Sequence, residues 1–121
     1  MVAFLKGLPD IVDKIDVLTK NGNVAITTIT YYELLKGASF SLMRQENLSE
    51  IKKVIASMVV VDLSLDACAE AAEIYRELKE DGRLIGEFDI IIAAMARTNH
   101  EALLTFDKHF KYVKGLEIAN W

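Results

Sequence analysis

The sequence predicts an α/β fold with a mainly parallel sheet, because short apolar or β-branched runs alternate with helix-forming segments. The chain has 121 residues, which is enough for one domain with one hydrophobic core. Hydrophobic residues make up 52% of the chain and charged residues 26%, as is typical of a folded globular protein. With only 1 proline and 6 glycines there is no candidate linker, so we treat residues 1–121 as a single domain.

The first half of the chain predicts a helix, a strand and a second helix. A proline at a first helical position, followed by apolar residues at helical spacing, predicts a helix from about Pro9 to Lys20. Val24–Thr27 is a short β-branched strand. Thr28 or Thr30 is then expected to cap a helix from Tyr31 to about Ala38.

The middle of the chain continues the alternation of helices and strands. A polar helical region is expected from roughly Phe40 to Ser57, followed by a strand at Met58–Val61. Ser64 is the expected cap of the next helix, which runs to about Asp81 before Gly82 ends it.

One apolar face is predicted for this last helix. Its members recur at three- and four-residue steps and are Leu65, Cys68, Ala69, Ala72, Tyr75 and Leu78. Membership of this face favours a core role for Cys68 over a reactive one. Since it is the one cysteine, no internal disulfide is possible, which fits a reducing cytoplasm.

The helix predicted from Glu87 to Thr98 carries an apolar run from Phe88 to Ala96 that only Asp89 interrupts. A helix that is hydrophobic all round is normally buried on all sides. The remaining elements are a strand, a brief turn or short helix, and a last edge strand, expected at Ala102–Thr105, Phe110–Val113 and Leu116–Ala119.

Three acidic residues are expected near one edge of this sheet, since parallel sheets place ligands beyond the carboxyl ends of their strands. Glu33 and Asp107 each follow a predicted strand, and Asp89 opens the helix that leads into the second of these strands. Clustered carboxylates suit Mg²⁺ or Mn²⁺, which can activate water beside a phosphoryl group. Each acid alone also has a structural explanation, as a helix-end partner, a surface residue or a turn residue.

Charge and hydropathy exclude some classes of function. The net charge of −4 weighs against tight DNA binding through a broad basic face, but a nuclease obtains positive charge from its metal ions. No apolar run is long enough to span a bilayer, and the first residues lack the pattern of a secretory signal. We therefore expect a cytoplasmic protein without a membrane partner.

Three segments together resemble the successive motifs of PIN-domain proteins, most of all the VapC toxins of type II toxin–antitoxin systems. They are Ile26–Gly37, Gly86–Ala94 and Leu103–Asp107, in the order and at the spacing of that family. The closing segment Phe110–Trp121 is similar as well. The resemblance implies a three-layer α/β/α sandwich and a Mg²⁺-dependent endoribonuclease that hydrolyses RNA phosphodiesters. It also implies a homodimer that a small antitoxin protein inhibits.

Residue by residue, the resemblance makes Glu33, Asp89 and Asp107 metal-binding catalytic acids. Thr105 matches the family's hydroxyl residue beside the last acid, and we expect it to contact substrate. Lys108 begins a local basic group that either meets RNA phosphates or is a solvated loop.

Other side chains near these motifs have open roles. Arg83 and Arg97 are candidates for contact with a phosphate or with a partner's carboxylate. Tyr31 and Tyr32 are expected to pack in the fold rather than to stack on bases. The first-turn residue Glu87 is expected to be a partner of the helix dipole.

The start of the chain departs from the family pattern, in which a central strand ends in an aspartate. Met1–Leu5 matches the family segment just after that strand, and no acidic residue precedes Asp10. We therefore expect the central strand and the first catalytic aspartate to be absent and the domain to be incomplete at its N-terminus. The chain would then begin at an internal methionine or be a shortened homologue, and an intact-mass measurement on the native protein would distinguish them.

Two other functions compete with the toxin. A non-catalytic PIN-like interaction protein is favoured by the missing first acid, and opposed by the three retained acids. A housekeeping RNA-processing nuclease would use the same fold and the same chemistry. A small antitoxin reading frame directly upstream of the gene would favour the toxin over this nuclease.

Overall fold

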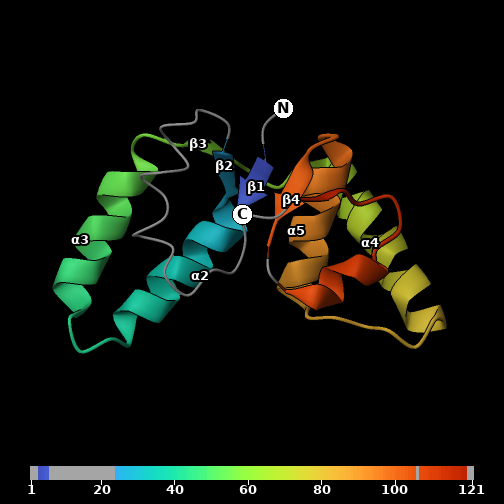
Figure 1. Cartoon of the computed structure of the whole chain (residues 1–121), viewed down its shortest axis with the longest axis horizontal. Coiled ribbons are helices and arrows are strands. Elements are labelled where there is room, and N and C mark those ends of the chain that lie inside the picture. Colours follow the sequence, from blue (N-terminus) through green and yellow to red (C-terminus); the bar gives the residue numbers. More distant parts are fainter. Residues whose placement is uncertain (1–2, 6–23, 106, 120–121) are drawn as a thin grey trace.

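The computed structural model of the chain describes residues 3–5, 24–105 and 107–119 (Figure 1). Its elements in chain order are β1 (Ala3–Leu5), β2 (Val24–Thr27), α2 (Thr28–Ser39), α3 (Arg44–Ile55), β3 (Val59–Val61), α4 (Leu65–Glu80), α5 (Glu87–Thr98), β4 (Ala102–Leu104), the 3₁₀ helix η1 (Lys108–Tyr112) and β5 (Ile118–Ala119). The helix expected from Pro9 to Lys20 lies outside the described residues.

The strands form one sheet in the order β3-β2-β1-β4-β5, and each neighbouring pair is parallel. The predicted α/β class is therefore confirmed. Because all of these strands run the same way, their carboxyl ends lie along one edge of the sheet. This edge is where a ligand site is expected in such a fold.

The expected absence of a central strand is wrong, because Ala3–Leu5 occupies the centre of the sheet. Ala3 is in register with Val24 on one side and with Ala102 on the other. Phe4 is buried between the layers, with 2% of its surface exposed. Without β1, the facing edges of β2 and β4 would carry unpaired backbone N–H and C=O groups, so even a very short apolar segment is held there.

Thr27 caps helix α2, in place of Thr28 or Thr30, which were expected from the sequence. Its Oγ1 accepts a hydrogen bond from the Thr30 N–H at 3.0 Å and lies 3.2 Å from the Thr30 hydroxyl. Both side chains are buried. A threonine at the end of a strand thus serves two elements, since it closes β2 and satisfies a free N–H of the helix that comes next.

The remaining boundaries agree with the predicted ones to within a few residues. Helix α3 differs most from its prediction. It begins at Arg44 and not near Phe40, because residues 40–43 form the turn after α2. Ser64 caps α4 as expected and accepts a hydrogen bond from the Ala67 N–H at 3.1 Å. Gly82 follows α4 with a φ of 68°, a left-handed conformation that glycine adopts without strain.

The buried face of α4 shares only Leu78 with the predicted one. Ala67, Ile74 and Leu78 are buried there, whereas Cys68 is exposed and Leu65 is 89% exposed. The helix carries two overlapping apolar faces, and packing against α5 buries the one that contains Ala67, Ile74 and Leu78. Cys68 is therefore not a core residue.

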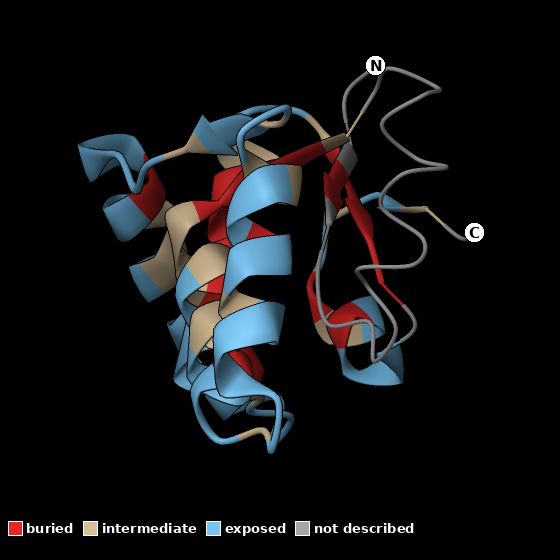
Figure 2. Cartoon of the chain, turned by 90° about the vertical axis from the view of Figure 1, so that its left-hand side faces the viewer, coloured by how far each residue is buried: buried red, intermediate tan, exposed pale blue. Residues whose placement is uncertain are grey.

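Helix α5 is the most buried helix described, as the sequence predicted. Its fully buried residues are Ile90 and the run Ile92–Ala96. Figure 2 shows the buried residues on the strands and on the parts of the helices that lie beside them. Phe88 is an exception to the predicted burial on all sides, since 40% of its surface is exposed.

Among the described residues, no helix is both long enough and apolar enough to cross a membrane.

The assignment of the α2 cap to Thr27 predicts different effects for neighbouring threonines. Thr27→Val keeps the shape of the side chain but removes the capping oxygen, and it should lower the free energy of unfolding by about 1–2 kcal/mol. Thr28→Val is the matched control and should change it far less. Urea unfolding followed by circular dichroism measures both, and equal losses would contradict the assignment.

Candidate active site

Helices α2 and α5 bring two of the predicted acids into one pocket. Glu33 lies in the second turn of α2 and Asp89 in the first turn of α5. Both line a pocket of about 290 Å³ together with Gly86, Glu87 and Phe88. The two acids are far apart in the sequence, so their meeting depends on how the two helices cross.

The crossing is held by an aromatic contact beside the acids. The rings of Tyr32 and Phe88 lie with centroids 5.7 Å apart at an interplanar angle of 89°. Such edge-to-face pairs stabilise by about 0.5–1.5 kcal/mol beyond the area they bury. Each ring directly precedes an acid in the sequence, so this contact lies beside the pocket of Glu33 and Asp89.

The start of α5 leaves room for the Asp89 carboxylate. The N-cap is Gly86, which has no side chain to cap the helix. A Cβ at Gly86 would stand 3.6 Å from Asp89 Oδ2, so the carboxylate lies back over the first turn. The positive end of the helix dipole stabilises a negative charge at this place.

Asp107 follows β4 and caps the helix η1. Its Oδ1 accepts a hydrogen bond from the His109 N–H at 2.9 Å and lies 2.8 Å from His109 Nδ1. The buried hydroxyl of Thr105 accepts a hydrogen bond from the Asp107 N–H at 3.0 Å. Thr105 therefore orients the turn that carries Asp107, and its direct contact with substrate stays a prediction.

The described residues do not bring all three acids together. Asp107 is not among the residues that line the pocket of Glu33 and Asp89. Within residues 3–5, 24–105 and 107–119, no group of three or more His, Cys, Asp or Glu side chains is arranged to hold a metal ion.

The two acids of the pocket nevertheless fit a hard divalent cation. Glu33 and Asp89 supply carboxylate oxygens, which are the donors that Mg²⁺ and Mn²⁺ prefer. Mg²⁺ commonly binds through one or two carboxylates and retains several waters, so a complete protein cage is not needed. The half-buried side chains of both acids remain within reach of solvent.

Basic side chains lie along and beside η1. Lys108, His109 and Lys111 are exposed on it. The Arg83 guanidinium lies 4.4 Å from the centre of the Tyr112 ring, a cation–π distance. The basic residues of η1 follow Asp107 directly, as the sequence indicated. The contact of Lys108 with a phosphate stays a prediction.

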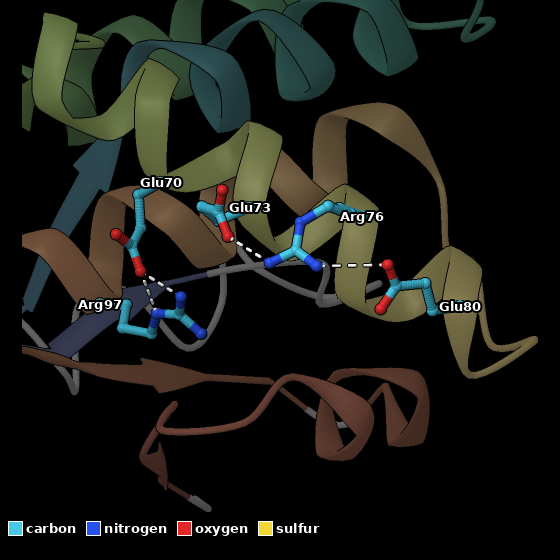
Figure 3. A network of polar contacts seen from close by, with 5 residues as sticks. All are labelled: Glu70, Glu73, Arg76, Glu80 and Arg97. Carbon is cyan, nitrogen blue, oxygen red and sulfur yellow. Dashed lines mark hydrogen bonds and ion pairs between the residues drawn. The ribbon is translucent and has the colours of Figure 1, made fainter.

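Arg97, a second candidate for phosphate contact, instead ties three segments of the fold together. Its Nε donates to Glu70 Oε1 at 2.6 Å, its Nη2 donates to the same oxygen, and its Nη1 donates to the Lys114 carbonyl at 2.6 Å. Figure 3 shows this pair beside the exposed Arg76, which bonds Glu73 and Glu80. The hydrogen bond that Arg76 donates to Glu73, more than the one it donates to Glu80, raises the pKa of Arg76.

The sequence analysis did not predict the contact between Tyr32 and Phe88 beside the pocket. It assigned Phe88 to a buried run and gave Lys36 no role. The usable signal was the repeated order aromatic–acid, in Tyr32-Glu33 and in Phe88-Asp89, on two segments that both carried candidate site residues.

The topology and the two acids place the chain in the class of α/β domains that bind ligands at the carboxyl edge of a parallel sheet. Within this class, the chain belongs to the PIN domain family, whose model matches residues 1–116. The resemblance seen in the sequence is thereby confirmed.

Curated relatives and solved structures agree with this family. The chain is 30% identical to ribonuclease VapC2 of Rickettsia felis over 110 residues, covering 90% of this chain and 82% of the relative. It is 33% identical to the tRNA(fMet)-specific endonuclease VapC of Shigella flexneri over 101 residues, covering 83% and 76%. The DNA-bound VapBC structure from Salmonella typhimurium matches with a TM-score of 0.88 and 25% identity, covering 100% of this chain and 99% of that one.

The bonds of Arg97 predict a structural effect of its removal. Arg97→Met should lower the free energy of unfolding by about 1–3 kcal/mol, because it leaves the partly buried Glu70 carboxylate without its partner. Arg76→Met is the matched control; it also removes bonds to glutamates, but these are exposed, so its effect on the urea midpoint should be small. An Arg97 variant as stable as the parent would contradict the assignment.

Proposed function

We propose that the chain is a divalent-metal-dependent endoribonuclease, the toxin of a toxin–antitoxin pair, which hydrolyses phosphodiester bonds of RNA. The observation that carries the proposal is the pocket shared by Glu33 and Asp89. It is supported by relatives that are named ribonucleases and endonucleases of the VapC type. The cation is Mg²⁺ or Mn²⁺.

The side chains of the pocket and of the segment after β4 have distinct roles in this proposal. Glu33 and Asp89 hold the metal, which, when bound, lowers the pKa of a water and neutralises charge on the phosphate. Asp107 is the third acid, and the hydrogen bonds around it fix the turn after β4. Lys108 and its basic neighbours on η1 bind flanking phosphates and so orient the RNA.

The proposed partners are a small antitoxin protein and a second copy of the chain. Solved neighbours from Rickettsia felis and Salmonella typhimurium are VapBC assemblies bound to DNA. On this chain, α4 leaves Leu65 and Tyr75 exposed beside Cys68, an apolar face that fits a protein contact. A cytoplasmic location remains a prediction.

One observation favours a non-catalytic interaction protein instead. Asp107 is not among the described residues that line the pocket of the other two acids. A protein of this kind would cleave no RNA at any Mg²⁺ or Mn²⁺ concentration, so the same assay decides between the two functions. A housekeeping RNA-processing nuclease would also cleave RNA, and an antitoxin frame beside the gene separates it from a toxin.

Asp89→Asn should abolish RNA cleavage in the presence of Mg²⁺ or Mn²⁺ while the chain stays folded. The substitution preserves the shape of the side chain but removes the charge that the metal requires. We expect a loss of at least about 100-fold in kcat, within the range of single catalytic interactions. A gel assay with a fluorescent RNA measures the rate.

Asp66→Asn is the control for this experiment, because Asp66 is also an aspartate in the first turn of a helix. It lines a different pocket with Arg97 and Glu101, at the other end of α5. The control should cleave RNA at the parent rate. An Asp89 variant that cleaves as well as the parent would show that the site is assigned wrongly.

A further inference from the structure

Two aromatic rings at the rim of the acidic pocket keep a large part of their surface open to solvent. Tyr32 is 50% exposed and Phe88 is 40% exposed, although they contact one another. Phe88 also lines the pocket beside Glu33 and Asp89. Exposed apolar surface next to a site commonly marks contact with a ligand, whereas packing alone would bury these rings further.

The positions of the two rings are well defined by the fold. Tyr32 projects from the second turn of α2 and Phe88 from the first turn of α5, so neither ring depends on a mobile loop. In their perpendicular arrangement the edge of one ring meets one face of the other, and the exposed parts of both rings remain available. A flat ligand group that stacks there would lie beside the acids without displacing them.

A positive charge accompanies this aromatic pair. Lys36 follows Tyr32 by one helical turn, and its Nζ lies 5.5 Å from the centre of the Tyr32 ring. Lys36 is exposed, so its ammonium group can also bind an anion. An aromatic surface, a cation and a metal-binding carboxylate pair side by side match the base, the phosphate and the scissile bond of a nucleic acid strand.

We infer that Tyr32 and Phe88 form a stacking platform for an unpaired base of the RNA, with Lys36 contacting a neighbouring phosphate. The inference rests on the proposed function and adds to it the residues that contact the base and the phosphate next to the cleaved bond. A base within a duplex has both faces covered by its neighbours, so the platform selects single-stranded regions.

The first test measures steady-state cleavage of a single-stranded oligonucleotide. Tyr32→Ala and Phe88→Ala should each raise KM roughly 10- to 100-fold with a smaller change in kcat, which is the typical effect of losing one stacked base. Tyr32→Phe and Phe88→Trp keep a ring and should retain the parent KM. Phe88→Leu keeps apolar volume without a ring, so it should behave like the alanine variant if stacking is the cause.

The second test reports binding without cleavage. Phe88→Trp places an indole in the platform, and in EDTA its emission should be quenched by a single-stranded oligonucleotide, with the signal of Trp121 measured in the parent as background. The same oligonucleotide with abasic nucleotides, and a duplex of the same sequence, should bind about tenfold more weakly and quench little. Circular dichroism confirms that each variant is folded.

The possible failures are distinguishable. If the parent cleaves RNA but Tyr32→Ala and Phe88→Ala match its KM, the platform is wrong and the proposed function stands. If the alanine variants bind RNA normally but no longer retain a co-expressed antitoxin, the rings are a protein contact and the inference is overturned. If the parent neither binds nor cleaves RNA, both the platform and the proposed function fall.

Discussion

The site depends on the crossing of α2 and α5, and the contact between Tyr32 and Phe88 holds that crossing at its functional end. Helix α5 has little freedom to move, since Ile90 and the run Ile92–Ala96 are buried in the core. Helix α2 is fixed at its start, where the Thr27 side chain closes β2 and caps the helix. With both helices anchored by the core and by this cap, Glu33 and Asp89 share one pocket, and the ring contact adds to the stability of the crossing.

The parallel sheet supplies the second constraint. Because β1, β2 and β4 run in the same direction, their carboxyl ends lie at one edge, and the next elements of the chain begin there. This places Asp107, after β4, at the edge expected for ligand binding. Its carboxylate is engaged by His109 as the cap of η1, so the fold assigns this acid a structural contact as well as a predicted catalytic one.

Most helices and strands could be predicted from local patterns, and the helix Glu87–Thr98 agrees at both ends. Some features could not be predicted, because they are not local. Ala3–Leu5 is too short to show a strand pattern, and its place comes from the pairing needs of two other strands. The buried face of α4 is selected by α5 from two apolar faces, which is why Cys68 is exposed.

The site could be predicted only in part, because its assembly also depends on contacts between distant segments. The candidate acids could be named from their positions after strands and at a helix start, and the resemblance to a family strengthened the choice. Which of them meet depends on the packing of side chains from distant segments. Glu33 and Asp89 meet where α2 crosses α5, beside the contact of Tyr32 and Phe88, and the aromatic–acid order in each segment does not predict which segments pack together.

The central claim is that Glu33 and Asp89 together hold a divalent cation. Calorimetric titration of Mn²⁺ into the parent, Glu33→Gln and Asp89→Asn tests it most directly. We expect one site in the parent, with an affinity that falls at least about tenfold in each variant, because each removes one of the carboxylate ligands. Equal Mn²⁺ affinity in all three proteins, or no binding to the parent, would contradict it.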